Sequence, residues 1–472
     1  MSIRLAIFCV IVAALMVYAW KDWFLALCAA IAFTALAEHE DMPRSMFGMA
    51  GMTPWNFLLI GVVAAFLVER QRSGRRWDMS PGMRWVFFGY LAVLVISGVR
   101  GTVDATSIDP WNGANIASTP GKFAIEHLIN PFKLMLPALM VYDGVRTRRQ
   151  VVWALVAIGA MGALYALLVC RRIDMGFLVD GSQHLRARLK LQQVIGLHAN
   201  DLATILGATC WGMLASISVW KSRGAHVLCL AIAMFIGLGM VLCFSRAGYI
   251  AFVGVGATLA VLRWRKLLFL LPVGVVMIAL FFPNVITRVT MGFGEDTETG
   301  ETATNMEVVT AGRSTDIWPP TLEQIAENPV FGYGRRAILR TPIYDKLRSE
   351  FGACPGHPHN AYMEIVLDGG ILSLVPVLIF FGGIWVISAR LFRTRGDPLA
   401  QGVGGLSLAH VTVLLITAMS AQSFYPKRSM VAMLCAWALA ARVWELRRKR
   451  VASRPVVRMV SAARPTLVSH LS

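Results

Sequence analysis

About a dozen apolar segments divide this chain, and they constrain its fold more than any other feature of the sequence. A helix that crosses a bilayer needs about 20 mainly apolar residues, and most of these segments reach or approach that length. Charged residues are only 15% of the 472 residues, which excludes an ordinary soluble protein. We therefore expect an all-α polytopic membrane protein with about 12 (12–13) transmembrane helices. The segments lie near residues 4–20, 23–37, 54–68, 84–100, 124–142, 150–170, 198–219, 226–244, 247–263, 266–282, 369–389, 403–424 and 429–445.

Basic residues in the short loops predict the side of the membrane on which each loop lies. Lys and Arg are enriched in cytoplasmic loops, and the basic clusters of this chain alternate as that rule requires. Much of the net charge of +18 is therefore a topology signal and gives no support to nucleic-acid binding. The loop 171–197, the Ser245-Arg246 hairpin and the stretch 283–360 are then placed outside. The cytoplasmic clusters are Arg70 to Arg76, Arg146 to Arg149, Lys221 and Arg223, Arg263 to Lys266, Arg390 to Arg395, and Arg447 to Arg450.

These assignments divide the chain into four parts. We expect an N-terminal transmembrane bundle over residues 1–282, which contains the basic outer loop 171–197. A large, partly helical outer loop over 283–360 follows, because this stretch is too long for a simple connection and has no apolar span of its own. C-terminal transmembrane helices over 361–446 and a basic cytoplasmic tail over 447–472 complete the chain.

Prolines interrupt one of the apolar segments. Asn130-Pro131 and Pro137 lie within residues 124–142. A break at membrane depth is tolerated only against protein or a water-filled cavity. We therefore expect a broken helix here that lines the functional site.

Arg246 stands alone between two apolar segments, on the side predicted to face outward. An arginine costs roughly 2.5–3.5 kcal/mol at the centre of a bilayer on insertion scales, so this position favours a functional role. Its small neighbours Ser245, Ala247 and Gly248 would let a bulky anionic group approach. The structural alternative is an arginine that extends its head group to the membrane interface.

Arg186 and Arg188 lie in the outer loop 171–197, which breaks the charge bias of the other short loops. A guanidinium group matches the oxygens of a phosphate and keeps its charge at any working pH. One or both arginines are therefore candidates for phosphate binding. A solvated loop, or a loop that contacts lipid headgroups, is the alternative.

The segment from Cys354 to Glu364 contains the densest group of candidate catalytic residues. His357 and His359 flank a proline and precede a helical segment that enters the membrane near Gly370. Asn360 is a good N-cap, which would place His359 at the positive end of a helix, where a neutral imidazole is favoured. Such a ring can accept a proton, although a lone histidine is more often structural.

Metal and cofactor sites are not expected. The two histidines lack the further ligands that a zinc site needs. The outer loops contain no Asp-x-Asp pair, and no glycine-rich phosphate loop is present. Eight cysteines show no paired spacing, which favours small core residues over disulfides or metal ligands.

In this arrangement the chain resembles the bacterial O-antigen ligase and O-antigen polymerase superfamily. Its members are integral membrane glycosyltransferases that act on lipid-diphosphate-linked glycans at the outer face of the inner membrane. The resemblance covers roughly residues 186–375. It rests on His359-Asn360 followed by Gly370-Ile371-Leu372-Ser373, on Phe244-Ser245-Arg246-Ala247-Gly248, on Arg186 or Arg188 ahead of His198-Ala199-Asn200-Asp201-Leu202-Ala203, and on Gly312-Arg313-Ser314 with Trp318 and Glu327-Asn328-Pro329 leading to Gly332 and Gly334.

The resemblance implies a donor glycan on undecaprenyl diphosphate and an acceptor hydroxyl at the periplasmic face of the bacterial inner membrane. His359 would be the general base, and the reaction would be inverting and independent of a metal or other cofactor. The expected partners are the donor, a glycan or lipid acceptor, membrane lipids and other polysaccharide assembly proteins. The diphosphate would bind Arg246, Arg188, Arg186 and Arg313, with Asn360, His357, Asn200 and Gly370 in support.

Two alternatives to a ligase remain at the level of sequence. The first is a polymerase that extends the repeat units of an O-antigen, capsule or exopolysaccharide. The second is a transporter of a lipid-linked glycan, which would favour charges through the bilayer interior and two related halves. The notable charges of this chain lie on one face instead.

Overall fold

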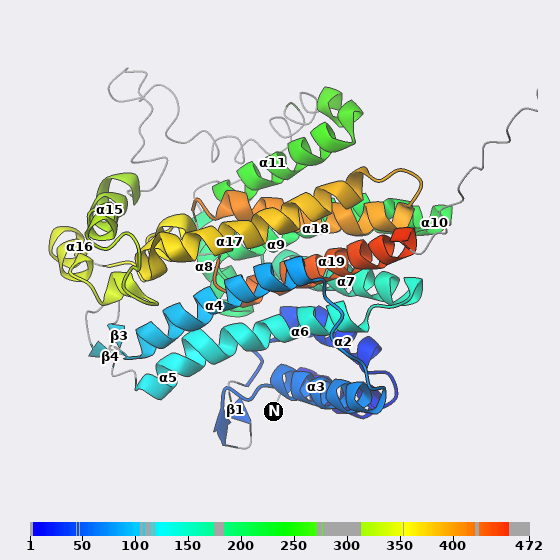
Figure 1. Ribbon diagram of the computed structural model, residues 1–472, viewed down its shortest axis with the longest axis horizontal. Coiled ribbons are helices and arrows are strands. Elements are labelled where there is room, and N and C mark those ends of the chain that lie inside the picture. The colour runs from blue at the N-terminus through cyan, green and yellow to red at the C-terminus, as the bar shows by residue number, and fades with distance from the viewer. Residues whose placement is uncertain are drawn as a thin grey trace, which may run out of the picture.

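The computed structural model describes residues 3–43, 45–46, 48–103, 107–108, 115–116, 119–173, 184–270, 276, 313–352, 354–420 and 424–452. Helices that run roughly side by side dominate this part of the chain, which confirms the all-α class (Figure 1). The α-helices are α1 (Ile3–Ala19), α2 (Trp23–Phe33), α3 (Pro54–Arg72), α4 (Pro81–Val103), α5 (Pro120–Ala124), α6 (Asn130–Gly144), α7 (Arg148–Arg172), α8 (His184–Ile195), α9 (Ala199–Ser216), α10 (Arg223–Val241), α11 (Arg246–Leu262), α15 (Trp318–Glu327), α16 (Ile343–Phe351), α17 (Ala361–Arg393), α18 (Pro398–Thr417) and α19 (Val431–Ala452).

Short elements connect these helices. Four two-residue strands form two antiparallel pairs. Strand β1 (Ser45–Met46) pairs with β2 (Met49–Ala50), and β3 (Ser107–Ile108) pairs with β4 (Asn115–Ile116). Turns of 3-10 helix are η1 (Thr34–Leu36), η5 (Ile217–Val219), η6 (Arg265–Leu270), η8 (Ala337–Leu339) and η9 (Arg428–Met430); π-helical turns are η2 (Ile125–Ile129) and η7 (Arg313–Ile317).

Within the described ranges, seven helices are long and apolar enough to cross a membrane, so the expected count of 12 is not confirmed. The other apolar helices are shorter: α1 and α11 have 17 residues each and α2 has 11. The predicted segment 266–282 lies mostly outside the described residues. Large apolar side chains are nevertheless exposed on outward helix faces, as contact with lipid requires; they include Val10, Val17, Trp85, Val227 and Ile250.

The segment 124–142 differs from the expected broken helix. Residues of α5, the π-turn η2 and α6 follow one another without a gap, and Pro131 lies directly after the π-turn. Pro137 lies inside α6. The irregularity is therefore a π-turn before the two prolines, which rearranges the hydrogen bonds without ending the helix.

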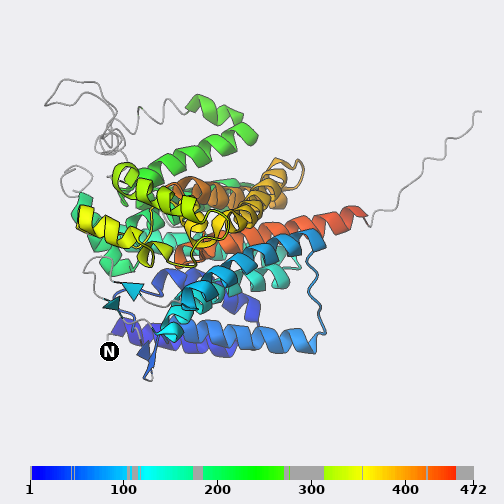
Figure 2. The same cartoon turned by 60° about the vertical axis from the view of Figure 1, so that its left-hand side comes forward.

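Small residues bring the central helices close together. Helix α18 packs along α9 and also contacts α17, α11 and α19. A Cβ atom on Gly405 of α18 would lie 2.3 Å from the Cβ atom of Ala215 in α9. Such close approach is how helices associate inside a bilayer, where apolar burial alone gives little advantage. Helices α1, α2 and α3 form a group at one side of this centre (Figure 2).

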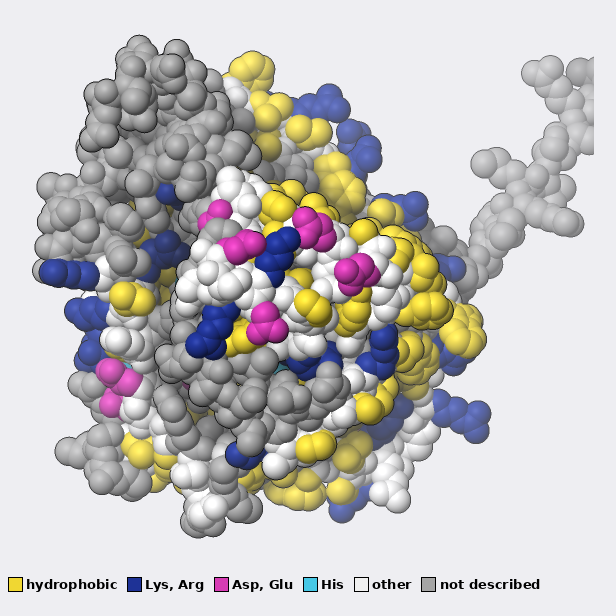
Figure 3. Space-filling model, turned by 90° about the vertical axis from the view of Figure 1, so that its left-hand side faces the viewer, with side chains coloured by type: hydrophobic (Ala, Val, Ile, Leu, Met, Phe, Trp, Pro, Cys, Tyr) yellow, Lys and Arg dark blue, Asp and Glu magenta, His cyan; other side chains and the backbone are white. Residues whose placement is uncertain are grey.

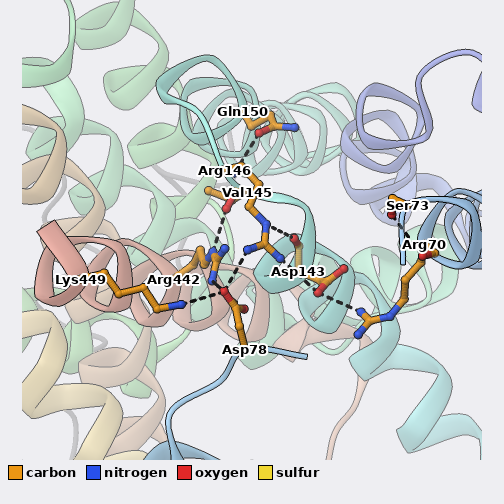
Figure 4. A network of polar contacts seen from close by, with 9 residues as sticks. All are labelled: Arg70, Ser73, Asp78, Asp143, Val145, Arg146, Gln150, Arg442 and Lys449. Carbon is orange, nitrogen blue, oxygen red and sulfur yellow. Dashed lines mark hydrogen bonds and ion pairs between the residues drawn. The ribbon is translucent and has the colours of Figure 1, made fainter. Parts of the chain in front are cut away.

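A polar network around Asp78 and the buried Asp143 ties together three of the loops that were predicted to share the cytoplasmic side (Figure 4). Asp78, in the loop before α4, accepts hydrogen bonds from Arg442 at 2.9 Å, Arg146 at 3.0 Å and Lys449 at 3.0 Å. Arg70 forms an ion pair with the buried Asp143 at 2.9 Å. The basic clusters around residues 70, 146 and 447 therefore lie at the same end of the molecule, as a shared side requires.

Replacing Asp78 with alanine is expected to destabilise the protein by about 3 kcal/mol, because the fully buried Arg442 would lose its counter-ion. Partial burial raises the pKa of Asp78, but the hydrogen bonds from Arg442 and Lys449 outweigh it and hold that pKa well below its usual range. The contribution of Asp78 to stability is thus present at neutral pH and is lost as the pH falls. Thermal unfolding in detergent measures the effect. Glu323→Gln, which breaks an exposed pair with Lys346, is the matched control and should leave the unfolding temperature unchanged.

Candidate active site

Asn200, in the first turn of α9, joins two of the sequence motifs. Its Oδ1 atom accepts hydrogen bonds from Nη2 of Arg188 at 3.2 Å and from Oγ of Ser245 at 2.8 Å. Ser245 is also the N-cap of α11, since its Oγ atom accepts the N–H of Gly248 at 3.1 Å. One amide oxygen therefore fixes Arg188 of α8 beside the start of α11, where Arg246 is the first residue.

Gly248 has a different role from the one expected. A Cβ atom at this position would lie 2.5 Å from the Cβ atom of Ala203 in α9. The small side chain therefore allows α11 to pack closely on α9. The expectation that Gly248 leaves space for an anionic group is wrong, because α9 fills that space.

Three arginines from separate parts of the chain lie near one another. Arg313, in the π-turn η7, donates a hydrogen bond to the carbonyl oxygen of Ser420 at 3.2 Å. Burial lowers the pKa of Arg313, and the positive charges of Arg188 and Arg246 lower it further. Burial and the positive charge of Arg246 also lower the pKa of Arg188. A cluster of cations that partly desolvate and repel one another is prepared for an anionic ligand. We call Arg188, Arg246 and Arg313 the arginine cluster.

Arg186 is the candidate that the structure separates from the others. It is exposed on α8, whereas Arg188 is half-buried and directed to Asn200. Residues two positions apart on a helix do not share a face. Of the two arginines, Arg188 is the one whose side chain contacts Asn200 of the next motif.

His357 and His359 lie in a tightly held loop before α17. Their ring centroids are 4.2 Å apart, and Nδ1 of His357 accepts the backbone N–H of His359 at 3.1 Å. Trp318 of α15 donates its indole N–H to the carbonyl oxygen of Pro358 at 3.1 Å. His359 has a φ of 54°, a left-handed conformation that is uncommon for a residue with a side chain and is often found at functional sites.

Asn360 is the N-cap of α17, as its position in the sequence predicted. Its side chain accepts the backbone N–H groups of Tyr362 at 3.0 Å and Met363 at 3.3 Å. His359 therefore lies at the positive end of this helix. Burial, together with the neighbouring His357, Arg313 and His198, lowers the pKa of His359 to about 3. Its imidazole is neutral at physiological pH, so one ring nitrogen keeps a lone pair that can accept a hydrogen bond.

The influence of Arg313 on His359 links the histidine loop to the arginine cluster. The side chain of Arg313 affects the pKa values of both His359 and His198, the N-cap of α9. Trp318 of α15 contacts Pro358 of the histidine loop, and α15 and α16 lie at the end of the molecule that faces the viewer in Figure 3. The candidate base and the candidate anion-binding groups, predicted from distant motifs, are brought together there.

Two further charged residues at this end were missed by the sequence analysis. Lys427 forms an ion pair with Asp201 at 2.7 Å, and its charge helps to lower the pKa of His357 to about 3, after burial. Arg335 is buried in ion pairs with Glu364 and Asp368 of α17. A signal for Arg335 was available, because two carboxylates four residues apart on an apolar helix require a cationic partner.

Gly370 interrupts α17 rather than merely starting a membrane helix. Its φ of 67° and ψ of −171° are not helical, and the break receives the segment that follows α15. The N–H of Ile371 donates to the carbonyl oxygen of Pro329 at 2.9 Å, and the N–H of Tyr333 donates to that of Leu367 at 2.9 Å. Gly370, the glycine of the His-Asn…Gly motif, therefore supports the site because the break at this residue lets the segment hydrogen-bond to the backbone of α17.

Gly370→Ala is expected to displace the segment from the break, because a Cβ atom would lie 1.9 Å from the carbonyl oxygen of Val330. The positive φ adds backbone strain for any residue with a side chain. Limited proteolysis should then cleave residues 313–352 faster than in the wild type. Gly382→Ala on the same helix, where a Cβ atom meets nothing within 4 Å, is the control and should keep the wild-type cleavage rate.

A cavity of about 1250 Å³ is lined by residues of α3, α6 and α8 and by Lys427. Trp55 and Leu59 of α3 and Asn130 and Leu134 of α6 contribute to its wall, and Lys427 lies at its margin. Segment 124–142 thus lines a cavity, and its role at the functional site stays a prediction. His359 and Arg246 do not line this cavity.

Comparison with known protein families gives a match for one part of the chain. Residues 229–378 match the sequence profile of the O-antigen ligase family. This part of the chain is an O-antigen ligase family domain. The domain includes Arg246, Arg313, His359 and Gly370, whereas Arg188 and Asn200 precede it in the sequence. No curated protein matches the chain with significant similarity.

The matched segment contains the motifs around Arg246, Arg313 and His359. Its family consists of membrane enzymes of the O-antigen ligase and polymerase type, and the chain has the apolar helices of a multi-pass membrane protein. The domain begins within α10 and ends within α17, so it spans both the Ser245-Arg246 turn and the histidine loop.

Proposed function

We propose that this protein transfers a glycan from undecaprenyl diphosphate to an acceptor hydroxyl at the periplasmic face of the bacterial inner membrane. The observation that carries the proposal is the arginine cluster beside a neutral His359. The O-antigen ligase family domain supports the choice of a lipid-linked glycan as the donor.

The arginine cluster would bind the diphosphate and stabilise it as a leaving group. Arg188, Arg246 and Arg313 come from α8, α11 and η7, so their guanidinium groups can approach a diphosphate from different directions. As the bond between the anomeric carbon and the phosphate oxygen breaks, negative charge increases on the diphosphate. Donors fixed in advance stabilise that charge without having to reorganise. The ion pair of each guanidinium with phosphate oxygens is strong and directional.

His359 would act as the general base. Its neutral ring removes the proton from the acceptor hydroxyl while the hydroxyl oxygen forms its bond to the anomeric carbon. The proton then resides on the imidazole, and the diphosphate leaves with the bonding electrons. Attack from the face opposite the diphosphate inverts the anomeric centre. No step of this reaction draws on a metal ion.

A reaction in detergent tests the proposal. The purified protein is incubated with a lipid-linked donor and a panel of hydroxyl-bearing acceptors, and the products are separated by mass. Glycan transfer is expected without vesicles, which a transporter could not achieve. Failure to transfer any donor, together with movement of the donor across liposome membranes, would contradict the proposal.

Ligases and repeat-unit polymerases share this chemistry and differ in the acceptor. Deleting the gene in its native host distinguishes them. Loss of a ligase leaves long lipid-linked polymer and an unmodified acceptor, whereas loss of a polymerase leaves single repeat units. We propose the ligase, and the accumulation of single repeats would assign the polymerase.

A further inference from the structure

Arg335 is one of the most deeply buried charges at this end of the molecule. Its side chain is 7% exposed, and its Nη1 atom contacts Oε1 of Glu364 and Oδ2 of Asp368, the latter at 3.0 Å. The guanidinium group lies 3.6 Å from the centroid of the Tyr425 ring. Glu364 and Asp368 are four residues apart and face the same side of α17. One arginine therefore bridges two turns at the start of this helix.

The backbone around Arg335 is held as firmly as its side chain. Its N–H donates to the carbonyl oxygen of Ser97 in α4 at 2.8 Å, and its carbonyl oxygen accepts from Nη2 of Arg340 at 2.6 Å. Arg100 of α4 donates to the carbonyl oxygens of Phe331 and Gly332, the latter at 2.7 Å. The segment that enters the break in α17 is thus fixed from α4 as well.

These contacts reach both ends of the histidine loop. On one side, the N–H of Glu364 donates to the carbonyl oxygen of Asn360 at 2.9 Å, so the Arg335 ion pair fixes the turn that begins immediately after His359. On the other side, Nη1 of Arg336 donates to the carbonyl oxygen of Gly356 at 2.8 Å. Adjacent residues of one segment therefore hold the chain before and after the two histidines.

We propose that Arg335 is a positioning residue, which holds His359 next to the arginine cluster through Glu364 and Asp368. The proposal rests on the glycan transfer proposed above. Arg335 does not touch the reacting atoms. Its ion pairs keep the first two turns of α17 fixed against α4 and the segment after α15, so that the left-handed conformation of His359 is maintained. A base that is held in place accelerates a reaction more than one that samples several positions.

Loss of the Arg335 ion pairs should change the pH dependence of transfer, which simple destabilisation would not do. In the wild type, His359 faces His357 on its own loop, Arg313 of η7 and His198 of α9, and transfer should not decline between pH 8 and pH 5 on account of His359. A released loop would expose the imidazole to water, and its pKa would return towards the ordinary value of about 6.5. Protonation of the base would then reduce transfer below about pH 6.5.

The test compares Arg335→Met, Arg335→Lys and the combined variant R335M/E364Q/D368N. The combined variant removes all three charges, so no unpaired carboxylate remains buried and the fold should persist. In both Met-containing variants we expect kcat to fall by about 100-fold, with a KM for the donor within about 3-fold of wild type and a new acidic limb near pH 6.5. Arg335→Lys, which retains the charge, should recover part of kcat.

Two controls separate this inference from the proposed function. Lys346→Gln breaks the exposed pair with Glu323 on the same outer segment and should keep wild-type kinetics. His359→Ala should abolish transfer; if it does not, the base assignment and the role of Arg335 both fail. If His359→Ala is inactive but the combined variant keeps the wild-type kcat and pH profile, the role of Arg335 alone is wrong. A loss of activity in the combined variant without an acidic limb would also overturn it, because that pattern indicates destabilisation.

Discussion

Replacing His359 with alanine is expected to reduce glycan transfer by about 10²–10⁴-fold while leaving membrane insertion intact. The reason is that His359 combines a neutral imidazole with the positive end of α17, and the charge of Arg313 acts on it. Binding of the donor should be nearly unchanged, since its diphosphate contacts the arginines. The measurement is transfer by purified protein under single-turnover conditions, with donor binding determined on the same preparation.

His226→Ala is the matched control for this substitution. His226 lies in the first turn of α10 and contacts the carbonyl oxygen of Trp220 at 2.8 Å. This end of α10 carries Lys221 and Arg223, which are predicted to be cytoplasmic. Its loss should leave transfer at the wild-type rate. Substantial transfer by His359→Ala would refute the assignment of the general base, and the mechanism would need a different proton acceptor.

Replacing Arg188 with alanine should lower kcat/KM for the donor by about 100–1000-fold, because one of three preorganised cations at the diphosphate is lost. Arg188→Lys should restore only part of this activity, since an ammonium group keeps the charge but lacks the planar pair of donors. Initial rates over a range of donor concentrations measure both effects.

Arg186→Ala provides the comparison within the same helix. Arg186 is exposed and is two residues from Arg188, so its replacement should change kcat/KM by less than about 3-fold. The two substitutions remove the same charge from the same loop. A comparable loss in both would indicate that α8 acts by its overall charge, and would contradict a specific contact of Arg188 with the donor.

The sequence predicted those features that depend on local patterns. Apolar length predicted the helices, and alternating basic loops predicted that Arg70, Arg146 and Lys449 would share one end. The contacts of Asp78 with Arg146 and Lys449, and of Asp143 with Arg70 and Arg146, confirm this for that group. Asn360 was recognised as an N-cap because its neighbours begin an apolar helix. Each of these features is determined by residues close together in the chain.

Features that depend on contacts between distant segments were not predictable in the same way. Arg186 and Arg188 were equivalent until the position of Asn200 distinguished them. Gly248 has its small side chain because α9 passes beside it, which no local pattern reveals. Arg335 was overlooked because its partners lie about 30 residues further along the chain.

The number of membrane spans also could not be predicted from apolar composition alone. Helix α2 has an apolar composition but only 11 residues before it continues into η1, so composition overestimates its reach. Pro131 and Pro137 predicted a broken helix, but the π-turn η2 joins α5 to α6 without a break. Hydropathy reports which residues avoid water and leaves open the geometry that they adopt.

Binding and turnover of one radiolabelled polyprenyl-diphosphate donor, measured on the same set of purified variants, test the central claim most directly. If the arginine cluster holds the diphosphate and His359 removes the proton, His359→Ala will bind the donor with the wild-type Kd and fail to transfer it. The variant R188A/R246A/R313A will lose donor binding. Wild-type donor affinity in that triple variant, or continued transfer by His359→Ala, would contradict the account.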